Sequence, residues 1–260
     1  MIARLAQLPL FLLLLGVSSA SMAVPALLAR YTRDYHDARA FGYAGIIGLL
    51  VTVLTAIALS GRKHNTSALR QLVALAAALV FLPLFFAVPF HEAVRNTTFE
   101  NAWFEMVSAL TTTGATLFDP ARLSVPEHFW RVQVGWMGGL LMWIAASGIL
   151  APLALGGFEV TATGEPGQSI LPGAARAIAN DPSQRLWRSI RVLLPVYIGL
   201  TGALSVLLLV AGDPPLIAIS HAMSTMATSG ISPIGTLTDA PSGLAGEVIV
   251  FCFLFFALSR

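Results

Sequence analysis

The sequence predicts an all-α integral membrane protein that contains repeated helix–loop–helix units. Its 260 residues are 56% hydrophobic and only 11% charged, whereas soluble domains are about half apolar and about a quarter charged. Six apolar runs approach the roughly 20 residues that a helix needs to cross the hydrocarbon layer. Between them lie two shorter apolar segments with a common pattern. The mean hydropathy of +0.78 agrees with this class and excludes a soluble globular protein.

Charge and cysteine content exclude several other classes. Fifteen Lys and Arg residues oppose thirteen Asp and Glu residues, and they lie in short stretches between the apolar runs, so no basic face for nucleic acid is expected. The one cysteine, Cys252, excludes a disulfide framework. The five histidines lie far apart and form no zinc motif. We therefore expect neither a nucleic-acid partner nor a bound metal cofactor.

Six membrane spans are expected in chain order. They lie at 5–29, 41–60, 71–90, 132–155, 190–211 and 244–260. The first run could be a signal peptide, because Arg4 precedes it and Ser19-Ala20 resembles a cleavage site. Its 25 residues exceed the usual apolar region of a signal peptide, which favours a retained span.

The distribution of charges favours a cytoplasmic N-terminus. With that orientation nine basic residues lie on the inner side and six on the outer side, which agrees with the positive-inside rule. Ten of the thirteen acidic residues then lie on or near the outer side. Such a surface either concentrates cations or is simply a tolerated location for acidic residues, and both interpretations stay open.

The two short segments are copies of one unit, displaced by 116 residues. The shift aligns Ser108 with Ser224 and Gly114 with Gly230, and internal repetition of this kind indicates repeated structure. Each copy is interpreted as span, short helix, Thr/Ser-Gly turn and span, with the short helices at 101–111 and 216–227 and the turns at 112–116 and 228–232. We therefore divide the chain into a two-span segment at 1–65 and two repeats at 66–160 and 161–260.

The first short helix is expected to begin near Thr98, because Thr97 and Glu100 fit a capping box. It should end at Thr111, where β-branched residues followed by Gly114 favour an extended backbone. Non-helical backbone at membrane depth requires protein or water around it, as in a re-entrant pore loop. Such a loop can present carbonyl oxygens to a dehydrated cation, and the glycine permits the positive φ that orients them.

These residues resemble the TrkH/KtrB family of bacterial potassium transporters, and in particular its TrkH branch. The resemblance covers essentially the whole chain. It rests on Phe104–Thr116 as the first pore helix and filter, Phe129–Arg131 with Trp136–Gly139 as the following helix, and Ala222–Gly230 as the second filter. It implies a fold of repeated helix–pore loop–helix units of the potassium-channel-like superfamily.

The resemblance also implies a function and a site. Gly114 and Gly230 would be the filter glycines, and the carbonyl groups of Thr112, Thr113, Thr228 and Ser229 would bind potassium, with Thr111, Ala115, Ala227 and Ile231 as possible flanks. A glycine at the first filter points to potassium over sodium. The implied setting is the bacterial cytoplasmic membrane, with a TrkA-like nucleotide-binding regulatory subunit and a homodimer. Neither a cofactor nor enzymatic turnover is expected.

The sequence departs from the family in one respect, because relatives have four pore-loop repeats and this chain has two. Two loops cannot encircle an ion. We therefore expect either the N-terminal part of a longer protein or a second chain that supplies the missing half. The alternative is a truncated, non-conducting membrane protein or scaffold of the same fold.

Some residues outside the filters also carry predictions. Gly135 and Gly139 form a GxxxG pattern, interpreted as close helix packing beside the filter. Arg131 is expected to snorkel to the outer interface, and His221 occupies the position of Glu105 in the second copy. The arginines of the segment 156–189, a predicted cytoplasmic connector, are a candidate contact with the regulatory subunit.

One rival function from another class is an intramembrane serine hydrolase. In that interpretation Ser147 would be the nucleophile and His221 its base. It names no oxyanion donors, and it leaves the paired Thr/Ser-Gly turns unexplained.

Overall fold

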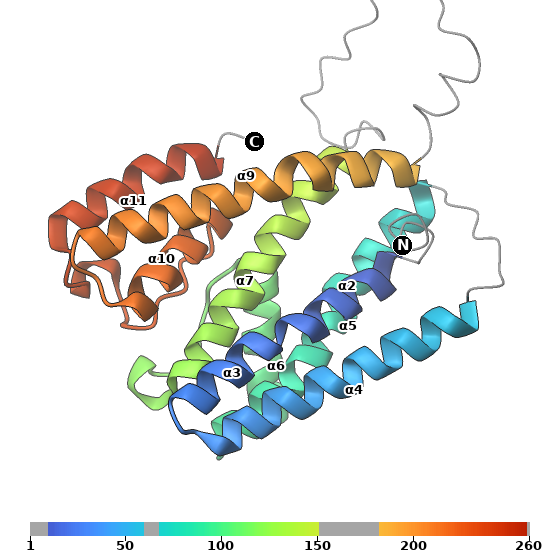
Figure 1. Ribbon diagram of the computed structural model, residues 1–260, viewed down its shortest axis with the longest axis horizontal. Coiled ribbons are helices and arrows are strands. Elements are labelled where there is room, and N and C mark those ends of the chain that lie inside the picture. Colours follow the sequence, from blue (N-terminus) through green and yellow to red (C-terminus); the bar gives the residue numbers. More distant parts are fainter. Residues whose placement is uncertain (1–9, 60–67, 151–181, 259–260) are drawn as a thin grey trace, which may run out of the picture.

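The structure is a computed structural model that describes residues 10–59, 68–150 and 182–258 (Figure 1). The described residues form helices and turns, with no strand among them. In chain order the helices are α2 (Leu10–Ser21), α3 (Ala23–Tyr31), α4 (Tyr35–Leu59), α5 (Ala68–Val94), α6 (Phe99–Leu110), η1 (Pro120–Arg122), α7 (Val125–Ala145), η2 (Ala146–Leu150), α9 (Pro182–Val210), α10 (Pro215–Ala227), η4 (Leu237–Asp239) and α11 (Gly243–Leu258). The predicted connector at 156–189 lies largely outside the described residues.

Five of the predicted spans are helices long and apolar enough to cross a membrane, so the chain is a multi-pass membrane protein. They are Leu10–Tyr31, Tyr35–Leu59, Leu69–Val94, Val125–Leu150 and Gln184–Val210. The sixth predicted run is the apolar helix Gly243–Leu258, whose 16 described residues are shorter than a full span. By the rise of about 1.5 Å per residue, such a helix covers about 24 Å of the hydrocarbon layer.

The first span is interrupted between Ser21 and Ala23. Pro25 has no N–H to donate to the carbonyl group of Ser21 four residues earlier, and this breaks the helical ladder. The Ser21 carbonyl oxygen instead accepts a 2.9 Å hydrogen bond from the side-chain amide of Gln133 on α7. The break thus fixes the N-terminal span against α7.

An aromatic core holds α4, α5 and α7 together. Trp130 on α7 is fully buried, and its ring centroid lies 5.7 Å from that of Phe41 and 5.5 Å from that of Phe86. Its indole N–H lies 3.4 Å from the carbonyl oxygen of Phe86. At the start of α7, the Ser124 hydroxyl donates a 2.6 Å hydrogen bond to Asp37 on α4. These contacts set the position of α7 in the bundle.

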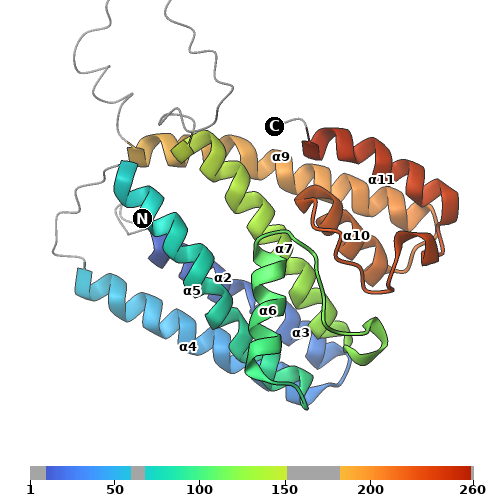
Figure 2. The same cartoon turned by 180° about the vertical axis from the view of Figure 1, so that it is seen from behind.

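The second repeat lies beside the first, with α7 next to both. In Figure 1 the helices α9, α10 and α11 form one group, and Figure 2 shows α6 in front of α5 and α7 from the other side. A separate apolar cluster joins α9, α10 and α11 through Leu204, Leu208, Ala222 and Val250. Helix α6 packs against α5 and α7, and α10 packs against α9 and α11 of its own repeat and also against α7.

The predicted start of α6 is corrected by one residue. The capping side chain is that of Thr98, which accepts a hydrogen bond from the backbone N–H of Asn101 at 3.4 Å. Thr97 instead accepts a bond from the side-chain amide of Asn101. The capping box that the spacing of Thr97 and Glu100 suggested is therefore wrong, and the helix begins at Phe99, one residue after the predicted start near Thr98.

Candidate functional site

The two short helices end in the same hydrogen-bonded turn. In the first copy, the N–H of Thr112 donates to the carbonyl group of Ala109 at 2.9 Å, and the N–H of Thr113 donates to that of Ser108 at 2.9 Å. The second copy repeats both bonds at residues 116 positions later. They join Thr228 to Thr225 and Ser229 to Ser224, each at 3.0 Å. The sequence repeat is therefore also a repeat of backbone geometry.

Both turns have positive φ at two corresponding positions. The angles are +57° at Thr112 and +74° at Gly114, and +54° at Thr228 and +67° at Gly230. The predicted end of the first short helix at Thr111 and the predicted positive φ at Gly114 are confirmed. The prediction of an extended backbone is wrong at Thr112, which is left-handed. A β-branched residue in this region is uncommon and costs about 1–2 kcal/mol, so surrounding contacts must hold both threonines in place.

The hydrogen bonds leave carbonyl groups free at both turns. The N–H groups of these turn residues point back to the short helix, where they donate to its last carbonyl groups. Within the described residues, nothing donates a hydrogen bond to the carbonyl oxygens of the four predicted ligands. These are Thr112, Thr113, Thr228 and Ser229. Each turn also follows a helix C-terminus, whose partial negative charge favours a cation.

Side chains fix each turn from behind. The Ser108 hydroxyl donates a 2.6 Å hydrogen bond to the carbonyl group of Ala115, which closes the first turn onto α6. Thr111 and Thr113 are exposed, and their hydroxyls lie 2.8 Å apart. In the second copy the hydroxyls of Ser224 and Ser229 lie 3.2 Å apart in a buried setting.

The two turns meet in space although they are 116 residues apart. A Cβ built on Gly114 would overlap the carbonyl oxygen of Ser229 and would lie 3.0 Å from its carbonyl carbon. The backbone of the first turn therefore touches that of the second. Gly230 has open space around the same position, with no atom within 4 Å. The two glycines share positive φ, but only the first lies in close contact with its counterpart.

Helix α7 brings the two turns together through a face of glycines. A Cβ on Gly138 would overlap the carbonyl oxygen of Leu110 at the end of α6, and one on Gly139 would lie 2.8 Å from the Cα of Ala227 at the end of α10. Gly135 faces Ile231, just beyond the second turn, with 3.1 Å to its Cδ1. The predicted role of the GxxxG pattern as close helix packing is confirmed beside the two Thr/Ser-Gly turns, and Gly138 extends it.

A buried ion pair lies behind the first turn. Arg131 on α7 is 3% exposed and pairs with Glu105 on α6, which is 2% exposed. The other carboxylate oxygen of Glu105 accepts a hydrogen bond from the N–H of Leu117 at 3.2 Å. The prediction that Arg131 snorkels to the interface is wrong, because a buried carboxylate 26 residues earlier holds it inside the protein.

His221 occupies the equivalent place behind the second turn. Its Nε2 lies 3.0 Å from the hydroxyl oxygen of Ser232. Ser232 also accepts the N–H of Ile234 at 3.2 Å, just as Thr116 accepts the N–H of Phe118 in the first copy. The expectation that neighbouring loops satisfy both groups is confirmed for one carboxylate oxygen of Glu105, which bonds to the N–H of Leu117, while Arg131 on α7 takes the other. It is confirmed only in part for His221, because its Nε2 meets Ser232 whereas its Nδ1 is buried without a hydrogen-bond partner among the described residues.

The serine hydrolase interpretation finds no support in this geometry. The Ser147 hydroxyl donates to the backbone carbonyl groups of Trp143 and Ile144, as an ordinary helical serine does. The ring of His221 is engaged with Ser232. Among the described residues, therefore, no bond joins the two side chains that the reaction would require to act as a pair.

Comparison with known proteins gives one consistent result. The chain is 30% identical over 224 residues to the Trk system potassium uptake protein TrkH of Vibrio parahaemolyticus, covering 85% of this chain and 44% of that protein. It is 27% identical to TrkI of Halomonas elongata over 242 residues, covering 89% of this chain and 46% of that protein. The chain thus spans about half the length of these curated relatives. No family profile matches it.

A solved structure shares the fold. The crystal structure of the potassium transporter TrkH from Vibrio parahaemolyticus superposes with a TM-score of 0.76 at 27% sequence identity. The superposition covers 98% of this chain and 50% of that one. The similar proteins are named as transporters rather than enzymes.

Proposed function

We propose that this chain, which is related in sequence and in fold to the Trk system potassium uptake proteins, forms two of the filter loops of a potassium uptake pore. It would act in the bacterial cytoplasmic membrane, with potassium as the transported ion and no cofactor. One observation carries the proposal. Two loops of the same backbone geometry touch each other, and no donor among the described residues bonds to four of their carbonyl groups.

The chemistry follows from what a potassium ion loses on entering the pore. Carbonyl oxygens replace its hydration shell, and they do so only where they are held in place. The proposed ligands are the carbonyl oxygens of Thr112, Thr113, Thr228 and Ser229, with Thr111, Ala115, Ala227 and Ile231 as flanks. Two loops supply oxygens to one side of an ion. The other side then comes from two further loops, either in a longer form of this chain or in a second chain.

The proposed units are a two-span segment at 1–65 and the repeats at 66–160 and 161–260. The exposed hydroxyls of Thr111 and Thr113 fit a partial filter, since that side of the first loop is uncovered. We also propose a TrkA-like cytoplasmic subunit and a homodimer as partners. Co-purification with such a subunit and cross-linking in membranes test these two assignments.

Rubidium uptake in a potassium-uptake-deficient bacterial strain tests the function. The 260-residue chain is compared with the protein extended to the end of its reading frame, with matched membrane levels measured by immunoblotting. We expect the extended protein to take up rubidium. Added potassium should inhibit this uptake by competition, and added sodium should not. No uptake by the extended protein at matched levels would contradict the proposal. Uptake by the short chain alone would mean that two copies complete one pore.

The alternative is a non-conducting scaffold of the same fold, and what supports it is that the chain spans about half the length of the curated relatives it matches. It predicts no rubidium uptake from either form, together with normal insertion in the membrane.

A further inference from the structure

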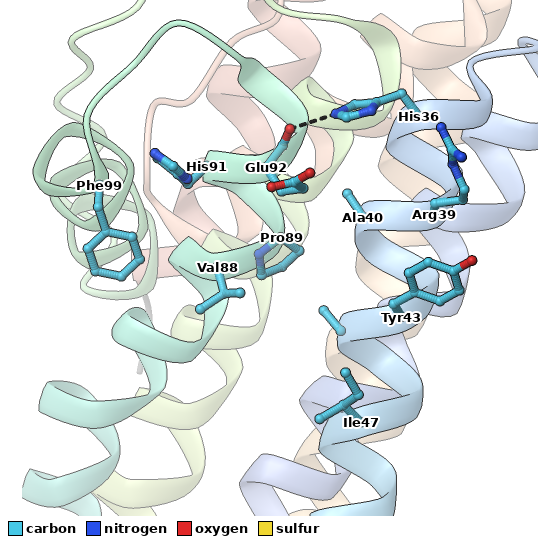
Figure 3. Close-up of a pocket in the computed structure, with 11 residues that line it drawn as sticks. His36, Arg39, Ala40, Tyr43, Ile47, Val88, Pro89, His91, Glu92 and Phe99 are labelled. Carbon is cyan, nitrogen blue, oxygen red and sulfur yellow. Dashed lines mark hydrogen bonds between the residues drawn. The ribbon is translucent and has the colours of Figure 1, made fainter.

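A groove on the outside of the bundle lies apart from the filter loops. It has a volume of about 630 Å³ and lies between α4, the C-terminal end of α5 and the start of α6 (Figure 3). Its two ends differ in chemistry. One end is lined by the polar side chains of His36, Arg39, His91 and Glu92, and the other by apolar ones that include Ile47 and Val88.

The polar end is organised by a contact between α4 and α5. The Nε2 of His36 donates a 2.8 Å hydrogen bond to the backbone carbonyl group of Glu92, which Figure 3 marks with a dashed line. This bond joins the start of α4 to the end of α5. It uses only the backbone of Glu92, so the carboxylate is left available.

Two opposite charges line this groove without pairing. The Nε of Arg39 donates to the carbonyl group of Tyr35 at 3.2 Å, and the two terminal nitrogens of its guanidinium group have no partner within the described ranges. The carboxylate of Glu92 likewise has no hydrogen bond or ion pair there; the single described ion pair is that of Glu105 and Arg131. The groove therefore offers one unpaired cation and one unpaired anion to a ligand.

The apolar end continues along α4 into the hydrocarbon layer. Tyr43, Ile47 and Val88 are 62%, 58% and 52% exposed, and Ala44 is small enough to leave a channel beside them. From His36 to Ile47 the helix rises about 16 Å, which is about half of the 30 Å hydrocarbon thickness. A ligand that fits both ends has a charged head and a long apolar tail.

We propose that this groove binds one phospholipid with a zwitterionic, amine-bearing headgroup, such as phosphatidylethanolamine. The phosphate group would accept hydrogen bonds from the terminal nitrogens of Arg39, since a guanidinium group matches phosphate oxygens. The ammonium group would donate to the Glu92 carboxylate, and one acyl chain would follow α4 past Ala44 and Ile47. A choline headgroup has no N–H for Glu92, and a glycerol headgroup brings no cation to it. This inference does not depend on ion conduction.

Native mass spectrometry of the full protein tests the proposal. The protein is equilibrated with phosphatidylethanolamine, phosphatidylcholine or phosphatidylglycerol of identical acyl chains, and retained lipid is counted per chain. We expect one retained phosphatidylethanolamine, bound about tenfold more tightly than the other two lipids, as befits one charge-assisted contact. Arg39→Gln should weaken it about tenfold, and Glu92→Gln should remove the preference over phosphatidylcholine.

Arg30→Gln is the matched control, because Arg30 is an exposed arginine near the same end of the bundle that does not line the groove. It should leave lipid retention unchanged. Equal retention of the three lipids would overturn the proposal, and so would equal losses in Arg30→Gln and Arg39→Gln. A preference for phosphatidylglycerol that needs Arg39 but not Glu92 would also overturn it, in favour of an anionic lipid.

Discussion

The contrast between Gly114 and Gly230 gives the sharpest test of the filter assignment. Both glycines have positive φ, so an alanine at either position costs about 1–2 kcal/mol of backbone strain. Only at Gly114 would the new Cβ also overlap the carbonyl oxygen of Ser229. Because carbon contacts are normally about 3.5–4.0 Å, one of the two loops must move by about 1 Å or more.

We therefore expect Gly114→Ala to reduce potassium-over-sodium selectivity far more than Gly230→Ala. In the full protein, competition of potassium and sodium against rubidium uptake measures this selectivity. Membrane levels of both variants serve as the control for folding. Wild-type selectivity in Gly114→Ala would refute the reasoning, as would a larger loss in Gly230→Ala, since both place the filter contact elsewhere.

Three further predictions concern the contacts that support the two Thr/Ser-Gly turns. Arg131→Met should lower the free energy of unfolding by about 3–5 kcal/mol because it leaves Glu105 buried and unpaired. Adding Glu105→Gln to this variant should recover part of the lost stability, as measured by thermal unfolding. A double variant no more stable than Arg131→Met would argue against the ion pair. Gly138→Ala should lower the melting temperature clearly more than Gly199→Ala, which has open space around its Cβ, and equal shifts would contradict the close approach of α7 to α6. Ser108→Ala should lower the free energy of unfolding by about 1 kcal/mol, because it removes the hydrogen bond to the carbonyl group of Ala115. It should also weaken ion selectivity in the uptake assay. Lowered stability with unchanged selectivity would make the role of Ser108 purely structural.

Much of the architecture could be predicted because membrane insertion depends on local hydropathy. Apolar runs and turn residues predict the long spans and the two short helices. The repeat at a spacing of 116 residues identifies the corresponding positions of the two copies. The positive φ of Thr112 and Thr228 could not be predicted from the sequence, since β-branched residues disfavour it. It arises from the hydrogen bonds that close each turn onto its helix.

Contacts between distant residues account for the other corrections. Arg131 at the start of a span looks like an interfacial residue, and only its encounter with Glu105 on another helix makes it a buried one. The break near Ser21 follows locally from Pro25, but the partner that satisfies the freed carbonyl group, Gln133, is more than 100 residues away. Such pairings are set by packing and have no signature in the neighbouring sequence.

The glycine face of α7 couples the movements of the two Thr/Ser-Gly turns. Gly138 lies against the last carbonyl group of α6, and Gly139 lies against the backbone of Ala227 at the end of α10. The neighbours of Gly138 are backbone atoms alone, whereas a Cβ on Gly139 would lie 2.7 Å from the Tyr197 hydroxyl oxygen and 2.8 Å from the Cα of Ala227. A tilt or slide of α7 therefore displaces the ends of α6 and α10 together, and both turns move with it.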